Sequence, residues 1–182
     1  MKSQVRVREV GPRDGFQNEP EVIATEDKLR LIELLGASGL RRIEVTSFVR
    51  PDVIPQLADA EQVLDAVRLP DLVSVSVLIP NERGLERALP LRSRFHEVNG
   101  FLSASETHNQ KNVGRSVEDS LAGLGRMFGR AAAEGLRCEG VISTSFGCPY
   151  EGRVPVARVL SIASQLAEFG CAEIGFGDTT GM

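Results

Sequence analysis

The run LVSVSVLI, Leu72–Ile79, predicts a β-strand, because apolar residues dominate it and Pro80-Asn81 follows it directly. Outward from this run, in both directions, strand-like segments alternate with helix-like segments. The predicted strands are Val5–Val10, Arg42–Thr46, Leu72–Ile79, His96–Leu102, Leu136–Thr144 and Ala172–Phe176. The predicted helices are Thr25–Ala37, Gln56–Val67, Arg83–Leu89, a helix that opens at Ser116 and ends at Gly135, and Val154–Phe169. This alternation favours a parallel sheet with helices packed outside it.

Local signals mark several of the helix ends. Thr25 is the expected N-cap of its helix, and Gly39 lies just past the end. Ser116 with Asp119 three residues later is similar to a capping box, and Gly135 is expected to end that helix. These end signals support the helix assignments independently of the apolar stripes.

Two architectures satisfy this alternation, the open doubly wound sheet and the closed (β/α)8 barrel. Dividing 182 residues among six units gives about 30 residues per unit, so that eight units need about 240. This is close to the roughly 250 residues typical of the barrel. Periodicity alone leaves both architectures open. No linker or charge block divides the chain, and a single domain over residues 1–182 is expected.

The composition of the chain argues against nucleic acids and membranes as binding partners. Lys and Arg number 21 and Asp and Glu 25, a net charge of −4, which provides no electrostatic footprint for nucleic acid or an anionic membrane. No apolar run approaches the roughly 18 residues that span a bilayer, and the N-terminus lacks the apolar core of a signal peptide. The three cysteines form no CxxC pair, which indicates reduced thiols. We expect a cytoplasmic enzyme or small-molecule binder.

Unusual polar clusters follow the predicted strands, where a parallel α/β fold places its functional residues. Three carboxylates, Asp14, Glu44 and Asp178, and the guanidinium of Arg13 would converge there. Clustered carboxylate oxygens suit Mg²⁺ or Mn²⁺, and an arginine beside such a metal suits a developing enolate. An Arg-Asp pair in a Gly-rich turn is also often a local salt bridge. Glu44 lies inside an apolar strand, so it needs either a partner or a function.

Taken together, these clusters resemble the family of 3-hydroxy-3-methylglutaryl-CoA lyases. The resemblance implies a metal-dependent (β/α)8 TIM barrel and covers the whole chain in order. Gly-Pro before Arg13-Asp14 favours the lyase branch over the related condensing synthases. The motifs that carry it are VGPRDGFQNE (Val10–Glu19), IEVTSFV (Ile43–Val49), VLIPN (Val77–Asn81), SASETHNQKN (Ser103–Asn112), GCPYEG (Gly147–Gly152) and GDTTG (Gly177–Gly181).

The resemblance also implies a role for each site residue. Asp14 would bind the divalent cation, Mg²⁺ or Mn²⁺, and Arg13 would stabilise the enolate formed when the carbon–carbon bond breaks. Glu44 would orient these groups, and Asp178 would relay the proton of the substrate hydroxyl. The residues expected to bind the acyl-CoA substrate are Arg13, Gln17, Ser105, Lys111 and Thr179. No nucleotide cofactor is implied beyond the CoA thioester itself.

Two further parts of the family's site have no counterpart in this sequence. The family's seventh strand ends in a His-x-His pair that completes the metal site, and its eighth strand leads to a catalytic cysteine loop. GCPYEG is similar to that loop, but Cys148 follows the fifth predicted strand, so we interpret it as a structural look-alike. The chain is therefore expected to be an N-terminal portion, a TIM barrel truncated to about six β/α units.

Three functional interpretations follow. The first is a lyase whose full-length form cleaves 3-hydroxy-3-methylglutaryl-CoA, is a homo-oligomer such as a dimer, and serves leucine breakdown, ketone-body formation or another acyl-CoA route. The second is a related barrel lyase or condensing synthase that acts on another 3-hydroxy-acyl-CoA. The third is a non-catalytic half-barrel that acts as a binding or oligomerisation partner. The 182-residue chain alone is expected to be inactive.

Overall fold

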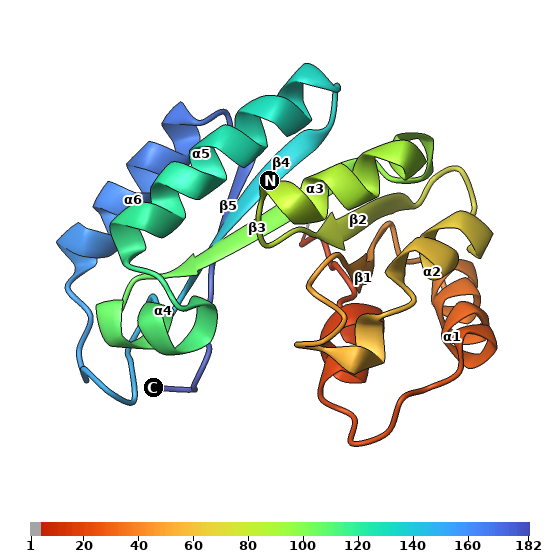
Figure 1. Ribbon diagram of the computed structural model, residues 1–182, viewed down its shortest axis with the longest axis horizontal. Coiled ribbons are helices and arrows are strands. Elements are labelled where there is room, and N and C mark those ends of the chain that lie inside the picture. Colours follow the sequence, from red (N-terminus) through yellow and green to blue (C-terminus); the bar gives the residue numbers. More distant parts are fainter. Residues whose placement is uncertain (1–4) are drawn as a thin grey trace. The chain divides into compact units, whose positions relative to one another are not determined.

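The computed structural model describes residues 5–182, which form two compact units. Unit 1 runs to Ile79 and includes Arg83–Glu97, and unit 2 comprises Pro80–Glu82 and Val98–Met182. The five strands of the sheet follow one another in chain order, β1-β2-β3-β4-β5 (Figure 1). Doubly wound sheets reverse their strand order at a switch point, whereas barrels add strands consecutively. The consecutive order therefore fits the predicted barrel type.

Unit 1 is built on the parallel pair of β1 (Arg42–Ser47) and β2 (Ser74–Leu78), which has a register shift between Glu44 and Thr46. Its core includes buried side chains on both strands and on the helices, such as Ile32, Ile43 and Leu64. The helical segments are a π-helical turn at Gly11–Gly15, α1 (Thr25–Ala37), a 3₁₀ turn at Pro55–Leu57, α2 (Ala60–Ala66), α3 (Glu82–Ala88) and a 3₁₀ segment at Leu89–Arg94.

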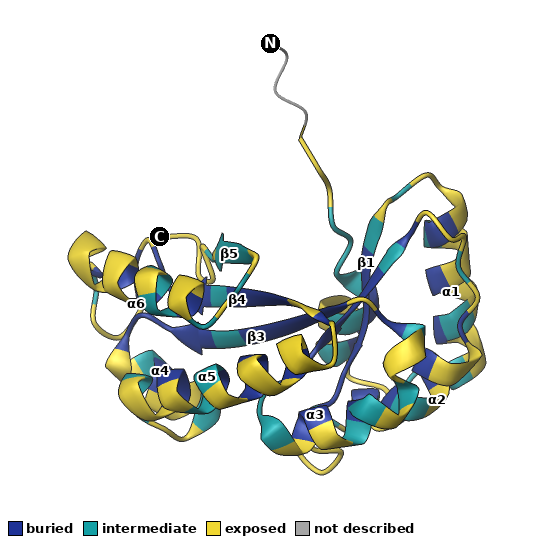
Figure 2. Cartoon of the chain, turned by 90° about the horizontal axis from the view of Figure 1, so that it is seen from above, coloured by how far each residue is buried: buried dark blue, intermediate teal, exposed yellow. Residues whose placement is uncertain are grey.

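Unit 2 contains β3 (Glu97–Ser103) from Val98 onward, β4 (Arg137–Ser143) and β5 (Glu173–Phe176), and β5 pairs with β4 in parallel. Its helices are α4 (Glu106–Val113), α5 (Val117–Ala133) and α6 (Val156–Glu168). Helices α5 and α6 pack against β4 and against each other. Figure 2 shows β3 and β4 in dark blue and the outer faces of these helices in yellow, so the strands form the buried layer.

Two glycines allow the helices of unit 2 to approach the strands closely. A Cβ added at Gly100 on β3 would lie 2.8 Å from side-chain atoms of Leu124 and Phe128, both on α5. A Cβ added at Gly140 on β4 would lie 2.8 Å from the side chain of Leu166 on α6. Real Cβ atoms do not tolerate such distances, so the packing of both helices depends on glycine at these positions.

Several helix ends follow the sequence signals. Ser116 is the N-cap of α5 and accepts a hydrogen bond from the Asp119 amide at 3.0 Å, as predicted. Gly39 and Gly135 have φ angles of +96° and +74° just past the ends of their helices, which confirms both terminators.

Four predictions were wrong or incomplete. The first predicted strand, Val5–Val10, is reduced to a single parallel bridge between Glu9 and Ile43, because Val5 and Val7 are exposed and pack against nothing that would extend the strand. The helix α1 has Ala24 at its N-cap; the Thr25 hydroxyl instead donates to Asp59 at 2.7 Å. The predicted helix at Gln56–Val67 is divided between the 3₁₀ turn and α2, and α4 was not predicted as a helix.

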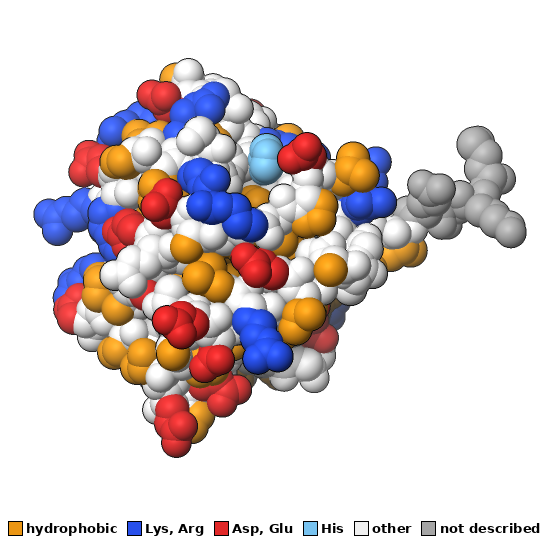
Figure 3. Space-filling model, turned by 90° about the vertical axis from the view of Figure 1, so that its right-hand side faces the viewer, with side chains coloured by type: hydrophobic (Ala, Val, Ile, Leu, Met, Phe, Trp, Pro, Cys, Tyr) orange, Lys and Arg blue, Asp and Glu red, His pale blue; other side chains and the backbone are white. Residues whose placement is uncertain are grey.

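One face of the protein mixes charges of both signs. On the face drawn in Figure 3, Lys and Arg side chains are interspersed with Asp and Glu and with scattered hydrophobic side chains. Within residues 5–182, no helix is both long enough and apolar enough to cross a membrane.

The close approach at Gly140 can be tested by substitution. We expect Gly140→Ala to lower the free energy of unfolding by about 1–3 kcal/mol, because the new methyl group overlaps the buried Leu166 side chain, which must move to make room. Urea denaturation measures the change. Gly129→Ala is the matched control, since Gly129 is exposed on α5 with nothing within 4 Å of an added Cβ. There the higher helix propensity of alanine should raise stability by up to about 1 kcal/mol. Equal effects at both positions would contradict the packing argument.

Candidate active-site residues

In unit 1, the turn after Glu9 brings Arg13 against Glu44 on β1. The Gly11 amide donates to the Glu9 carboxylate at 2.6 Å, which holds the start of the turn. Arg13 Nε then donates to Glu44 Oε1 at 2.5 Å, and its Nη1 donates to Asp14 Oδ1 at 2.7 Å. The Glu44 side chain is only 3% exposed. The buried Glu44 carboxylate therefore has a partner, as its burial requires. That partner, Arg13, is itself a predicted catalytic residue.

Asp14 differs from Glu44 in exposure, since 54% of its side chain is accessible. An exposed carboxylate can bind a cation from solvent, but a divalent cation takes several oxygen ligands. No group of three or more His, Cys, Asp or Glu residues within the described part of the chain is arranged to hold a metal. Among the described residues of unit 1, the predicted ligand Asp14 therefore has no complete set of ligands around it. Gln17 lies on the same turn and is half-buried.

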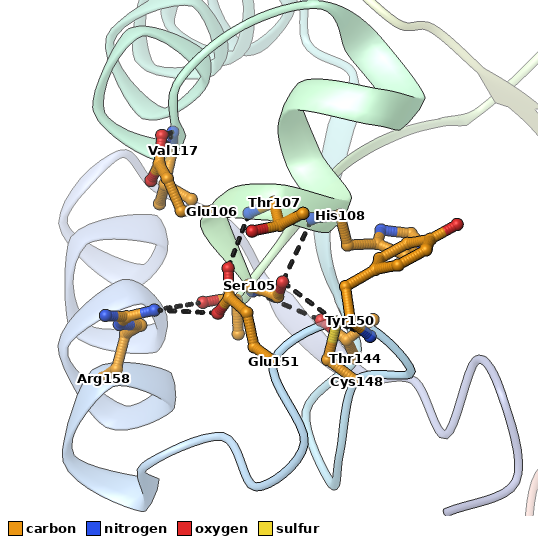
Figure 4. A network of polar contacts seen from close by, with 11 residues as sticks. Ser105, Glu106, Thr107, His108, Val117, Thr144, Cys148, Tyr150, Glu151 and Arg158 are labelled. Carbon is orange, nitrogen blue, oxygen red and sulfur yellow. Dashed lines mark hydrogen bonds and ion pairs between the residues drawn. The ribbon is translucent and has the colours of Figure 1, made fainter.

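In unit 2, Ser105 is the centre of a polar network at the end of β3 (Figure 4). It is fully buried, is the N-cap of α4, and its hydroxyl accepts a hydrogen bond from the His108 amide at 3.1 Å. The Cys148 thiol donates to the same hydroxyl at 3.0 Å, and the Ser105 amide donates to Thr144 Oγ1 at 3.3 Å. Ser105 therefore joins α4 to residues that follow β4.

Glu151 reaches the same network from the loop after β4. Its carboxylate accepts a hydrogen bond from the Thr107 amide at 2.6 Å, and the Arg158 guanidinium lies 3.6 Å away. Partial burial by itself would raise the pKa of Glu151. Hydrogen bonds from Thr107 and Ser105 and the charge of Arg158 outweigh that effect and hold the pKa below its usual value. The group at the first turn of α4 is therefore a carboxylate anion at neutral pH.

Lys111 and Thr179 are both tied to residues of this network. The Lys111 ammonium lies over the ring of Tyr150, 4.9 Å from its centroid, which is a cation–π contact. Thr179 accepts a hydrogen bond from the Thr144 amide at 2.9 Å. Ser105 and Thr179 are therefore both hydrogen-bonded to Thr144. Thr144 has φ +56°, and it is the single non-glycine residue among those described with a left-handed backbone. Such strained positions cluster at functional sites.

The predicted site residues therefore form two groups, one in each unit. Arg13, Asp14 and Glu44 are in contact in unit 1. Ser105, Lys111 and Thr179 belong to one network in unit 2. Asp178, the residue before Thr179, accepts a hydrogen bond from the Met182 amide at 3.1 Å.

Sequence reasoning missed three residues of the second group. Thr144 carries no sequence signal, because its left-handed backbone is imposed by its neighbours. Tyr150 and Glu151 lie in the GCPYEG motif, whose similarity to a catalytic loop directed attention to the cysteine. Within this motif, Tyr150 contacts Lys111 of α4 and Glu151 contacts Thr107 of α4, and these residues stand two and three positions after Cys148.

The three free cysteines lie in different environments. Burial raises the pKa of Cys138 to about 11, and burial together with Cys138 and Glu139 raises that of Cys171 to about 12. At Cys148, burial also acts to raise the pKa. Hydrogen bonds from the Ser105 side chain and from the backbone at Glu151 and Tyr150 outweigh it, and the pKa lies below its ordinary value. Cys148 is therefore the most readily ionised thiol of the three.

This order of thiol acidity can be measured. In a variant with Cys138→Ala and Cys171→Ala, we expect the ultraviolet absorbance of the Cys148 thiolate to appear at a lower pH than for an ordinary thiol. Ser105→Ala in that background should move the transition to higher pH, because the hydrogen bond that stabilises the thiolate is removed. A variant that keeps only Cys171 should titrate above the ordinary value for a thiol, because burial and Glu139 still raise its pKa, but at a lower pH than in the unaltered chain, because Cys138 is gone. A Cys148 transition above the ordinary value, or one indifferent to Ser105, would contradict this assignment.

Comparison with known proteins agrees with these motifs. The family model described as HMGL-like matches residues 4–182. The chain is 46% identical over 178 residues to the hydroxymethylglutaryl-CoA lyase YngG of Bacillus subtilis, covering 98% of this chain and 59% of that protein. The solved structure of the B. subtilis HMG-CoA lyase has a TM-score of 0.94, again with 98% and 59% coverage.

Two further relatives extend the comparison. The cytoplasmic 3-hydroxy-3-methylglutaryl-CoA lyase of Danio rerio is 43% identical over 98% of this chain and 52% of its own length. An HMG-CoA lyase structure from Acinetobacter baumannii, in complex with coenzyme A and 3-methylmalate, has a TM-score of 0.92 at 37% identity, covering 97% of this chain and 57% of that one. The chain thus spans between about half and three fifths of the length of the relatives it matches.

Proposed function

The chain belongs to the HMGL-like family, and on that premise we propose that the full-length protein cleaves 3-hydroxy-3-methylglutaryl-CoA to acetyl-CoA and acetoacetate. The observation that carries the proposal is the Arg13 guanidinium, held by the buried Glu44 beside the exposed Asp14. A cation fixed in this way cannot reorient freely, and preorganised positive charge is what a developing enolate requires. The relatives named above are lyases for this substrate.

The proposed reaction is a retro-Claisen cleavage. The C3 hydroxyl of the substrate loses its proton to Asp178, the C2–C3 bond breaks, and C3 becomes the ketone of acetoacetate. The electron pair of the broken bond passes to the thioester as an enolate, whose oxygen Arg13 stabilises. Protonation of the enolate carbon then yields acetyl-CoA. Glu44 keeps Arg13 in place through the 2.5 Å hydrogen bond, so its role is to orient the guanidinium.

A divalent cation, Mg²⁺ or Mn²⁺, would supply the positive charge that lowers the pKa of the substrate hydroxyl when bound. The described residues fit this ion only through Asp14, which is exposed and anchored by Arg13. We propose Asp14 as one ligand of the full-length enzyme. Because the set is incomplete, we expect the 182-residue chain by itself to show no measurable lyase activity with either cation; acetoacetate release by the purified chain would contradict this.

We further propose that the network of unit 2 binds the CoA thioester. The exposed Lys111 ammonium provides positive charge and the exposed Thr179 a hydroxyl group, and the buried Ser105 would act on the ligand through the helix that it caps. The coenzyme A bound to the A. baumannii relative supports an acyl-CoA ligand. Gln17, on the same turn as Arg13, is proposed to position the substrate. We retain the cytoplasm as the proposed compartment, since all three thiols are free, and a homo-oligomer as the proposed assembly.

An assay of the full-length protein tests the function. With Mg²⁺ or Mn²⁺ present, we expect acetoacetate release from 3-hydroxy-3-methylglutaryl-CoA. Arg13→Lys should lower kcat by about 10²–10³-fold, because lysine keeps the charge but loses the planar fork that Glu44 orients. Arg126→Ala, on the exposed face of α5, should leave kcat unchanged. Release from a different 3-hydroxy-acyl-CoA alone would favour the related lyase or synthase, and no turnover of any such substrate would favour the non-catalytic interpretation.

A further inference from the structure

The helix α4 carries Lys111 and is capped by Ser105, yet it has almost no apolar anchorage. Of its eight residues, Asn109 is the single buried one, and that side chain is polar. Amphipathic surface helices usually take their position from an apolar stripe packed on the core. Because α4 lacks such a stripe, polar contacts must determine where it lies.

Asn109 provides one end of this polar anchorage. Its Oδ1 accepts a hydrogen bond from the Ser103 amide at 2.9 Å. Its Nδ2 donates to the Arg115 and Ser116 carbonyl oxygens and to Ser120 Oγ, all at 3.0 Å or less. These contacts fix the middle of α4 against the end of β3 and the start of α5. They do not reach the first turn of the helix.

The first turn is held from outside the helix. The first amides of a helix have no partner within it and need acceptors from elsewhere. Ser105 accepts from the His108 amide, and the Thr107 amide donates to Glu151, a residue 44 positions further along the chain. A carboxylate at this end also interacts favourably with the helix dipole. Glu151 thus completes the cap that Ser105 begins.

The Glu151 carboxylate is itself positioned by neighbours on both sides. Arg158 on α6 lies 3.6 Å from Glu151, and the same guanidinium donates to the Ala104 carbonyl oxygen at 3.3 Å (Figure 4). Cys148 and Gly152 exchange two backbone hydrogen bonds of 2.8 and 2.7 Å, which close the loop that contains Glu151. The loop is therefore held closed at both ends by backbone contacts.

Two other residues of this closed loop contact α4. The Tyr150 ring lies against the Lys111 ammonium at 4.9 Å, and the Cys148 thiol donates to Ser105 at 3.0 Å. The Cys148–Gly152 loop therefore touches the start of α4, its first turn and its lysine. Glu151 thus holds the amide of Thr107, which lies one turn before the lysine, while the Glu106 carboxylate holds the same turn to the start of α5 by accepting from the Val117 amide.

We propose that Glu151 is a positioning residue, which acts through the first turn of α4, together with the Tyr150 ring, to hold the Lys111 ammonium for an anionic group of the CoA ligand. This inference rests on the proposed function, in which Lys111 meets the acyl-CoA. It predicts that loss of the Glu151 charge weakens ligand binding rather than the chemical step.

The experiment uses the full-length protein and two measurements, steady-state kinetics with 3-hydroxy-3-methylglutaryl-CoA and calorimetric binding of free coenzyme A. We expect Glu151→Gln to raise KM and the Kd for coenzyme A by about tenfold, as for loss of one charge-assisted hydrogen bond, with kcat changed less than about twofold. Glu168→Gln, at the exposed end of α6, is the matched control and should change neither constant.

Two further variants separate positioning from general destabilisation. Tyr150→Leu should weaken coenzyme A binding by several-fold, whereas Tyr150→Phe, which keeps the ring, should preserve it. In a Lys111→Met background, Glu151→Gln should cause little additional loss, because the effect passes through the lysine. Full additivity of the two changes, unchanged binding in Glu151→Gln, or a fall in kcat alone would overturn the proposal.

The binding measurement also separates this inference from the proposed function. If the protein binds coenzyme A in a Glu151-dependent way but shows no lyase activity, the proposed function fails and the positioning role stands. If it is an active lyase whose coenzyme A affinity ignores Glu151 and Tyr150, the positioning role fails and the function stands.

Discussion

Parallel strand pairing is the constraint on which the described structure depends. A parallel strand cannot be joined to its neighbour by a tight turn, so the chain must return through a crossover, here with a helix between β1 and β2 and another between β4 and β5. Every crossover begins where a strand ends. The polar residues that follow a strand therefore lie beyond the end of the sheet, where they no longer pair with a neighbouring strand. Ser105 stands just after β3 and Asp178–Thr179 just after β5, whereas Arg13–Asp14 follow the single bridge at Glu9. Their placement follows from where the strand, or the bridge, ends.

Close packing in unit 2 is the second consequence of this arrangement. Helices that cover a sheet must lie near it to exclude water, and glycines at Gly100 and Gly140 remove the side chains that would hold α5 and α6 away. The strands between them are buried, so they form a rigid support for the loops at their ends. The network around Ser105 lies at the end of β3, next to these buried strands.

Buried polar groups explain how the two groups of site residues are kept in place. Glu44 is buried on an apolar strand and is compensated by the Arg13 guanidinium. Ser105 is buried at the end of β3 and is compensated by Cys148, Thr144 and the first turn of α4. In both groups an uncompensated polar atom would cost free energy, so the contacts that satisfy the polar atoms also fix the orientation of functional side chains.

Local sequence signals were reliable where one interaction within a few residues decides the structure. Ser116 caps α5 because its hydroxyl reaches an amide three residues away, and Gly39 and Gly135 end helices because glycine adopts a left-handed backbone at little cost. The strand expected at Val5–Val10 shrank to a bridge because strand formation needs a neighbour and a covering layer, neither of which is local. Likewise, the Thr25 hydroxyl donates to Asp59, a residue distant in the sequence, and therefore does not cap its own helix.

By itself the sequence determined the alternation of strands and helices, the family, and which residue types follow each strand, because periodicity and motifs are properties of neighbouring residues. It left the barrel and the doubly wound sheet open until the motifs were considered together. Only the tertiary structure decided that Glu44 forms an ion pair with Arg13 and that Thr144 takes a left-handed backbone. It also decided that Glu151 caps a helix that begins 45 residues before it. Those contacts join residues far apart in the chain, and their energies depend on burial and distance, which no local pattern encodes.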